Sequence, residues 1–244
     1  MSQKIKAPNE KGAGGFLWGV VAIIVIAAVV IAFVVWKGSS KNADALAIGQ
    51  DDVDFSVTAQ DNKVTLKSDK VAKDAPVVDI YEDFSCPHCA DLVTADNEDI
   101  KQAVSDGKMT VNLHFLNFLD GGKPGSSTRA AAVATVLAEN NPKAFWNMHA
   151  KAFLDQDEVA RQWGWEQFAD SLKDYNLDDS VINSIRDGSV QKKGEDVAAA
   201  NTEELKQKAG KVSAPVVYAD GKEVQLKRGE NGKPSSWVSD VVKG

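Results

Sequence analysis

The pattern of apolar and polar positions predicts strands arranged around one helix in the first half of the chain's polar region. Alternating apolar residues at 53–57 and at 64–66 predict two half-buried strands. A β-rich run follows at 77–81, and residues 87–105 carry apolar side chains at helical spacing. Alternation returns at 109–119, so a fourth strand is expected directly after the helix.

The second half of this region changes from a helical to a β pattern. Residues from about 125 to 210 form a mainly helical block, whose first helix is expected to be capped by a serine or threonine at 126–128. Residues 215–226 then alternate around Asp220-Gly221, which is the sequence typical of a hairpin with a type I′ turn. Residues 237–242 suit a short closing helix.

Residues 16–36 form an uncharged apolar run that predicts one transmembrane helix. A spanning helix needs about 20 such residues at about 1.5 Å each, and the lysines before the run give a slight bias toward a cytoplasmic N-terminus. A cleaved signal peptide would have an apolar core of only about 7–15 residues. A buried core helix is disfavoured because the run is apolar on every face. We therefore expect a short cytoplasmic N-terminus at 1–15, an anchor at 16–36, a tether at 37–50 and a folded domain at 51–244.

The composition is that of a globular protein with an acidic surface. The chain has 244 residues, of which 43% are hydrophobic and 26% are charged, and its formal net charge is -7. Nucleic-acid binding is not expected, because neutralising phosphates requires a basic face. The chain has 2 cysteines, Cys86 and Cys89, and 3 histidines, so we expect neither a framework of structural disulfides nor a metal site.

The candidate chemistry lies in Cys86-Pro87-His88-Cys89, where a predicted strand is followed by a predicted helix. Two intervening residues let both thiols meet at the first helical turn, whose unpaired N–H groups and dipole stabilise an anion. Cys86 is the expected thiolate, Pro87 suits the first helical position, and His88 can donate a hydrogen bond or positive charge to the same sulfur. A stabilised thiolate stabilises the reduced form, so the disulfide of this pair should pass readily to substrate thiols.

Other uses of a Cys-x-x-Cys pair compete with redox chemistry. A structural disulfide that closes so short a ring constrains the unfolded chain little. A zinc site needs four ligands, and only His114 and His149 remain as further histidines. Covalent haem needs a histidine directly after the second cysteine, where Ala90 stands. Redox catalysis by Cys86 and Cys89, with no cofactor besides their own disulfide, is the favoured hypothesis.

Two segments resemble the DsbA-like thiol:disulfide oxidoreductases of the thioredoxin superfamily. YEDFSCPHC at 81–89 is similar to their active-site segment, and VSAPVVYADGK at 212–222 is similar to their later strand and hairpin. The order of elements agrees from about residue 70 to 244, loosely in the helical block. With its N-terminal anchor, the chain most resembles the membrane-tethered actinobacterial enzymes of the MdbA type. The resemblance implies an α/β thioredoxin fold with a helical insertion at about 125–210, preceded by one transmembrane helix.

The resemblance also implies roles for individual residues. Cys86 would be the exposed nucleophile and Cys89 the buried resolving thiol, while His88 tunes the Cys86 thiolate. Pro215 would follow a cis peptide bond and face the disulfide, and the backbone of Ala214 would pair with substrate as an added strand.

Three acidic residues, Asp79, Glu82 and Asp83, lie in the run that leads to Cys86. A buried carboxylate there could relay protons to Cys89. The alternative is that these side chains reach solvent or cap the helix, and the sequence does not separate the two interpretations.

The residues and the resemblance together predict an extracytoplasmic enzyme that donates its disulfide to unfolded or newly exported cysteine-containing proteins. It would be held at the cell membrane by its single helix, with the catalytic domain outside, and be reoxidised by a DsbB- or VKOR-type membrane quinone reductase. A thioredoxin-like reductase, serving for example cytochrome c maturation, is one alternative. A non-enzymatic module whose Cys-x-x-Cys pair is structural or holds a metal is the other.

Overall fold

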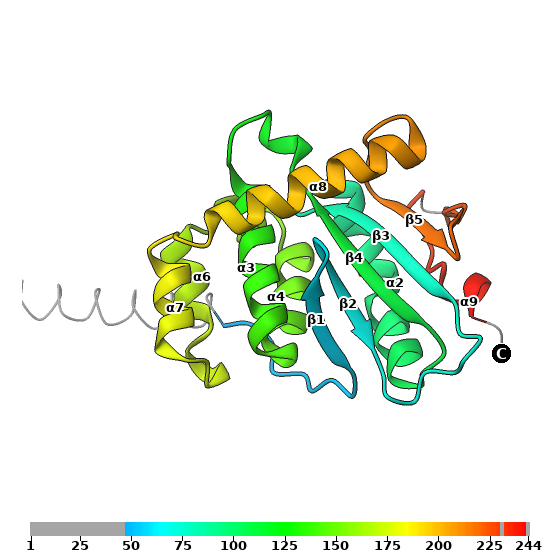
Figure 1. Ribbon diagram of the computed structural model, residues 1–244, viewed down its shortest axis with the longest axis horizontal. Helices are drawn as coiled ribbons and strands as arrows, with labels where there is room; N and C mark the ends of the chain where they lie inside the picture. Colours follow the sequence, from blue (N-terminus) through cyan, green and yellow to red (C-terminus); the bar gives the residue numbers. More distant parts are fainter. Residues whose placement is uncertain (1–46, 230–231, 243–244) are drawn as a thin grey trace, which may run out of the picture. The chain divides into compact units, whose positions relative to one another are not determined.

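The computed structural model describes residues 47–229 and 232–242 (Figure 1). The predicted N-terminus at 1–15, the predicted anchor at 16–36 and residues 37–46 of the predicted tether lie outside these ranges. Within them, no helix has both the length and the apolar character needed to cross a bilayer.

The folded unit begins three residues before the predicted boundary, at Ile48. Ile48 is buried, with 6% of its surface exposed. The Tyr175 hydroxyl donates to the Gly49 carbonyl, and the Asn147 side chain exchanges hydrogen bonds of 3.0 and 2.8 Å with the backbone of Asp51. The end of the predicted tether at 48–50 therefore belongs to the fold, because its apolar residue finds a place in the core.

A six-stranded sheet runs through the molecule in the order β1-β2-β4-β3-β5-β6. Strands β3 and β4 are parallel, and all other neighbours are antiparallel. The first strand was predicted at 53–57 but begins at Ser56. Its pairing with β2 ends there, because Ser56 is opposite Lys67, the last residue of β2. The strands are β1 Ser56–Gln60, β2 Lys63–Lys67, β3 Val77–Asp83, β4 Thr110–Leu116, β5 Val216–Ala219 and β6 Lys222–Glu223.

The C-terminal hairpin has the predicted turn. Asp220 and Gly221 take φ values of 47° and 77°, as both central residues of a type I′ turn require. Its second strand is shorter than the predicted one, although the Val224 amide still donates to the Val217 carbonyl at 2.8 Å.

Helices account for most of the chain between β4 and β5. The helix predicted at 87–105 is confirmed as α2, the predicted helical block contains α3 to α8, and the 3₁₀ turn η1 precedes that block. The helices are α2 Pro87–Ser105, η1 Phe118–Asp120, α3 Ser126–Asn140, α4 Pro142–Leu154, α5 Val159–Gln162, α6 Trp165–Ser171, η2 Lys173–Tyr175, α7 Asp179–Arg186, α8 Gln191–Ala209 and α9 Val238–Val241.

The first helix of the block is capped from a distance and not by its own serines or threonine. Its N-cap residue is Gly125. The Asp120 carboxylate accepts hydrogen bonds from the amides of Gly125, Ser127 and Thr128 at 3.0, 3.0 and 2.8 Å. A negative charge at a helix N-terminus is favourable, so this carboxylate replaces the expected local cap.

Helices cover both faces of the sheet, with α8 in front of the strands and α2 behind them in Figure 1. Alternation along β3 sends Ile80 and Glu82 toward α2 and α4, where both line one small cavity. Tyr81 points to the other face, and its hydroxyl donates to Glu204 of α8 at 2.5 Å. Side chains on the two faces of β3 therefore contact different helices.

Candidate active site

The two cysteines occupy the start of α2 as predicted. Cys86 is the N-cap residue, Pro87 takes the first helical position, and Cys89 lies one turn into the helix. The Cys86 amide donates to the Asp83 carbonyl at 2.9 Å, which turns the chain from β3 into the helix. Both residues are present as free thiols.

The surroundings of the two sulfurs make their acidities very different. A hydrogen bond from the Cys89 thiol and the backbone N–H groups of Cys89 and His88 lower the pKa of Cys86 to about 6, against an opposing contribution from burial. Burial and the neighbouring Cys86 sulfur raise the pKa of Cys89 well above its usual value. One sulfur therefore carries the negative charge and the other keeps its proton at neutral pH.

Cys86 is less accessible than predicted. Only 5% of its surface is exposed, compared with 1% for Cys89. The Ala214 carbonyl lies 3.5 Å from the Cys86 sulfur and covers it from the side of the later loop. The two thiols therefore differ little in exposed area, and they are distinguished mainly by their pKa values.

His88 acts on Cys86 through its backbone. Its side chain is exposed, and among the described residues no hydrogen bond joins its imidazole to the Cys86 sulfur. The His88 N–H is one of the groups that lower the pKa of Cys86. The part of the prediction that gave this role to the imidazole therefore has no support in the geometry.

The loop before β5 faces the cysteines. The Ala214–Pro215 peptide bond is cis, as the resemblance implied. These two residues and His88 line a cavity of about 230 Å³ together with Leu226, Arg228 and Pro234. A wider groove of about 490 Å³ is lined by Pro87, and its further lining residues include Ala90, Asp91, Thr94, Leu154, Glu158 and Arg161.

Gln156, which the sequence did not mark, holds the active-site loop from the helical block. Its buried side-chain amide donates to the carbonyls of Phe84 and Cys86, at 2.8 Å each. Arg161 adds a hydrogen bond of 3.0 Å to the Ser85 carbonyl. A glutamine between two helices carries no recognisable signal, because its role depends on contacts some 70 residues away in sequence.

Only one of the three candidate relay residues faces Cys89. Glu82 lines the same buried cavity as Cys89, and its charge is among the causes that raise the pKa of that thiol. Asp79 lies on the opposite face of the sheet, where it bonds to Asn112 and His114. The prediction for Asp79 is therefore wrong, because alternation along β3 turns it away from the cysteines.

Asp83 is also directed away from Cys89 and holds the loops around the site. Its carboxylate accepts from the Ser85 amide at 2.9 Å, the Ser127 hydroxyl at 2.5 Å and the Leu119 amide at 3.1 Å. Burial raises its pKa, and these hydrogen bonds oppose the change. Asp83 thus positions the start of α3 and the η1 turn instead of relaying protons.

Two further buried residues near Cys89 were missed as site residues. His149 of α4 contacts Glu82 at 2.5 Å between Nε2 and Oε1, and Asp96 of α2 accepts from the Trp237 indole at 2.6 Å. A signal for Asp96 was present: it lies seven residues after Cys89, on the helix face that buries Leu92 and Val93. A carboxyl group on a buried, apolar helix face is costly to bury, so such a residue is a candidate for a functional role.

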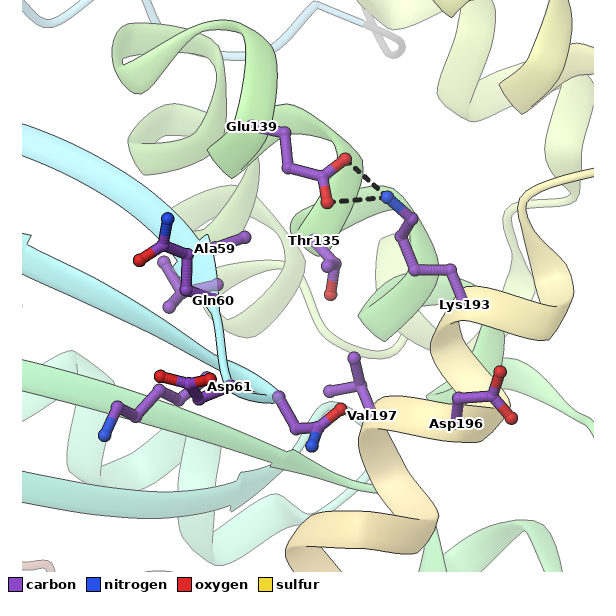
Figure 2. Close-up of a pocket in the computed structure, with 11 residues that line it drawn as sticks. Ala59, Gln60, Asp61, Thr135, Glu139, Lys193, Asp196 and Val197 are labelled. Atoms are coloured by element: carbon purple, nitrogen blue, oxygen red, sulfur yellow. Dashed lines mark hydrogen bonds and ion pairs between the residues drawn. The ribbon is translucent and has the colours of Figure 1, made fainter.

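A separate cavity of about 380 Å³ lies between the β1–β2 hairpin and helices α3 and α8 (Figure 2). The Lys193 ammonium bonds to the Glu139 carboxylate across it, at 2.6 Å from Oε1. The residues that line this cavity include neither of the two cysteines. In the part of the chain that the structure describes, no group of three or more His, Cys, Asp or Glu side chains is arranged to hold a metal ion.

Comparison with known families agrees with this geometry. A family model described as thioredoxin matches residues 72–235, which include both cysteines and the cis-proline loop. The chain belongs to the thioredoxin family. The fold prediction is thereby confirmed for the described residues, while the N-terminal helix stays a prediction.

Solved structures place this thioredoxin-family protein with the DsbA-like thiol:disulfide oxidoreductases. The MdbA protein of Corynebacterium diphtheriae, a thiol-disulfide oxidoreductase, is 37% identical, with a TM-score of 0.70 over 76% of this chain and 93% of that chain. The MdbA protein of Corynebacterium matruchotii is 31% identical, with a TM-score of 0.73 over 84% of this chain and 98% of that chain. The predicted resemblance and the predicted enzyme class are both confirmed.

A curated relative shares part of this thioredoxin-family chain. The serine/threonine-protein kinase PknE of Mycobacterium tuberculosis is 28% identical over 119 residues, which is 46% of this chain. The chain spans only 21% of the length of that kinase. This similarity therefore says nothing about the activity of the whole protein.

Proposed function

We propose that this protein is an extracytoplasmic thiol:disulfide oxidase that introduces disulfide bonds into translocated proteins. The observation that carries the proposal is the difference in acidity between the two sulfurs: the pKa of Cys86 is lowered to about 6 and that of Cys89 is raised. A thiolate that is stable at neutral pH is a good leaving group, and it stabilises the reduced form of the enzyme. A stabilised reduced form makes the disulfide a strong oxidant.

The reaction transfers two electrons from substrate to enzyme. A substrate thiolate attacks the Cys86 sulfur, the Cys86–Cys89 bond breaks, and the electron pair of that bond goes to the Cys89 sulfur. Cys89 then takes a proton, for which Glu82 is the candidate carrier because it shares the cavity of Cys89 and its charge acts on the pKa of that thiol. The second substrate thiolate attacks the substrate sulfur of the mixed disulfide and releases Cys86 as a thiolate.

The surface around Cys86 supports a polypeptide substrate. The cavity at Ala214 and Pro215 is also lined by His88, and the wider groove is lined by Pro87, so both border the residues that directly follow Cys86 and offer space to an extended chain. The half-buried backbone at Ala214 would pair with that chain as an added strand. Unfolded or newly exported cysteine-containing proteins have the required extended backbone.

Location and recycling complete the proposal. The apolar run at 16–36 would hold the protein in the cell membrane as a single span, with the catalytic domain on the extracytoplasmic side. Reduced enzyme would pass its electrons to a DsbB- or VKOR-type quinone reductase in the same membrane. The similarity to MdbA, described as a thiol-disulfide oxidoreductase, supports this cycle.

Two measurements on the full-length protein test the proposal. Equilibration with glutathione should give a reduction potential above about -200 mV, whereas a value near the thioredoxin figure of about -270 mV would favour a reductase. Cys86→Ala should abolish oxidation of a reduced, unfolded protein, while Glu98→Gln, an exposed change on the same helix, should not. If Cys86→Ala oxidises as fast as the parent, the site is not catalytic and a binding module becomes the better explanation.

A further inference from the structure

A small closed cavity below Cys89 collects titratable side chains from three elements. Its volume is about 20 Å³, enough for one water molecule. Glu82 of β3, Asp96 of α2 and His149 of α4 all line it together with Cys89. Most of the remaining wall is apolar: Leu66, Ile80, Leu92, Val93, Ile100, Leu113, Trp146 and Pro215.

Two polar atoms of these side chains have no hydrogen-bond partner within the described residues: Asp96 Oδ1 and His149 Nδ1. The other ends of both groups are well bonded, Asp96 Oδ2 to the Trp237 indole and His149 Nε2 to Glu82. A buried polar atom without a partner is costly, so such atoms are rare unless they meet a water molecule or take part in chemistry.

The environment of Asp96 suits proton transfer at neutral pH. Burial is the main reason that its pKa rises to about 8, the Glu82 and Asp99 charges add to the rise, and the Trp237 hydrogen bond opposes it. An acid whose pKa lies close to the ambient pH can both give and take a proton. The groups that face it are Cys89 and Asp99 from its own helix, Glu82 from β3, His149 from α4 and the Trp237 indole beside α9.

We propose that Asp96 is a second proton carrier for Cys89, which it serves through Glu82 and one water molecule in the cavity. This role rests on the proposed oxidase function and names the residue that supplies the proton which Glu82 passes to Cys89. His149 contacts Glu82 from the helical block and holds its carboxyl group at the cavity that Cys89 and Asp96 also line.

The proton balance of the step is closed within the protein. When substrate thiolate breaks the Cys86–Cys89 bond, Cys89 leaves with the electron pair. Asp96 passes its proton through the water to the Glu82 carboxylate, and Glu82 passes a proton on to the Cys89 sulfur, so Asp96 becomes a carboxylate and Glu82 ends as it began. When Cys89 later attacks a mixed disulfide at Cys86 during reoxidation, its proton returns along the same route. The electrons move only among the sulfurs.

A pH profile of the Cys89 step tests the proposal. In a single turnover, Cys89 of the full-length protein releases a small thiol that has been attached to Cys86 as a mixed disulfide. Asp96→Asn should slow this release about tenfold at pH 7 and remove an inflection near pH 8. Glu98→Gln, a carboxylate-to-amide change at an exposed position of the same helix, should keep the parent profile. An unchanged profile in Asp96→Asn would overturn the proposal.

A spectroscopic readout is independent of turnover. The Trp237 indole N–H resonance should titrate near pH 8 in the unmodified protein, because it reports the charge on Asp96. Glu82→Gln should lower this midpoint by removing a repelling charge. If the resonance does not move between about pH 6 and 10, Asp96 carries no exchangeable proton there and the proposal fails, even where Asp96→Asn does not fold.

The oxidase function and the role of Asp96 are tested separately. A thioredoxin-like reduction potential or an active Cys86→Ala variant would disprove the oxidase function. Normal oxidase activity together with an Asp96→Asn pH profile that matches the parent would disprove only the role of Asp96. Alkylation of Cys86 should titrate alike in parent and Asp96→Asn, and a shifted Cys86 titration would assign the effect to the nucleophile and overturn the relay.

Discussion

Two buried histidines each pair with a carboxylate of strand β3, on opposite faces of the sheet. The two pairs differ in how completely their polar atoms are hydrogen-bonded. On the α8 face, His114 meets Asp79, with 3.2 Å between Nε2 and Oδ1. On the α2 face, His149 meets Glu82, with 2.5 Å between Nε2 and Oε1. Both histidines are almost fully buried. The difference lies in what surrounds each pair.

The pair on the α8 face is fully bonded. His114 Nδ1 lies 3.3 Å from the Asn201 carbonyl oxygen, whose orientation is set because the Asn201 amide donates to the Phe115 carbonyl at 3.0 Å. Both ring nitrogens of His114 therefore face an oxygen atom within hydrogen-bonding distance. Asp79 also accepts from Asn112 and forms an ion pair with Lys208. These hydrogen bonds and the ion pair together hold α8 against the sheet.

The pair on the α2 face is incomplete, and it adjoins Cys89. His149 Nδ1 has no partner among the described residues, and Asp96 Oδ1 across the same cavity has none either. Buried polar groups in folded proteins are nearly always satisfied, so the exceptions mark places where a proton moves or a water molecule is held. The comparison thus separates a structural pair from a catalytic one within a single strand.

The largest expected difference between the faces is in rate. Glu82→Gln should slow the Cys89-dependent release from a mixed disulfide by about 10²-fold, since general acid–base catalysis is lost. Asp79→Asn should leave this rate within about twofold, because its side chain lies on the far face. Stopped-flow kinetics on both variants give the two numbers. Equal slowing of the two variants would break the comparison.

The next effect is on stability, and its sign distinguishes Asp96. Its pKa is raised to about 8 in the folded state by burial. The protonated group therefore contributes stability that is complete below the unfolded pKa of about 3.9 and is lost as pH rises toward about 8. Asp96→Asn removes this loss, so its stability relative to the parent should rise by about 1.4 kcal/mol per pH unit in that window. Urea unfolding at pH 4, 6 and 8 measures the trend, and a flat difference would contradict it.

Local geometry made part of the site predictable from the sequence. The residues between β3 and α2 determine their own arrangement: Cys86 caps the helix, and Pro87 starts it because it needs no amide partner. The Asp220-Gly221 turn is equally local. These features depend on backbone preferences of a few consecutive residues, which a pattern can report.

The rest depended on contacts between distant segments. Asp79, Glu82 and Asp83 look alike in the sequence, and only the pleat of β3 and the packing of α4 show which of them faces Cys89. Gln156 and Ala214 both reach Cys86 from distant parts of the chain. The low exposure of Cys86 therefore could not be predicted from the residues around it. Tertiary packing, not local propensity, assigns these roles.

The opposite pH dependence is expected on the α8 face. Burial alone would raise the pKa of Asp79, but hydrogen bonds from His114 and Asn112 and the charge of Lys208 hold it well below its usual range. Its contribution to stability is thus present above about pH 4 and is lost as pH falls further. Asp79→Asn should lower the free energy of unfolding by about 2 kcal/mol at pH 7, with the difference shrinking in acid. A difference that grows in acid would reverse the assignment.

The smallest expected effect is at the rim of the α8-face network. The Thr65 hydroxyl donates to the Asn112 side-chain oxygen at 2.8 Å, and Asn112 in turn donates to Asp79. Thr65→Val keeps the β-branched shape and removes only this hydrogen bond, so unfolding should become easier by about 1 kcal/mol. Thr58→Val, an exposed position directly opposite on β1, is the matched control and should stay within about 0.5 kcal/mol. If Thr65→Val also slowed the Cys89 step, the two faces would be coupled through the sheet, and the division into a structural and a catalytic pair would no longer hold.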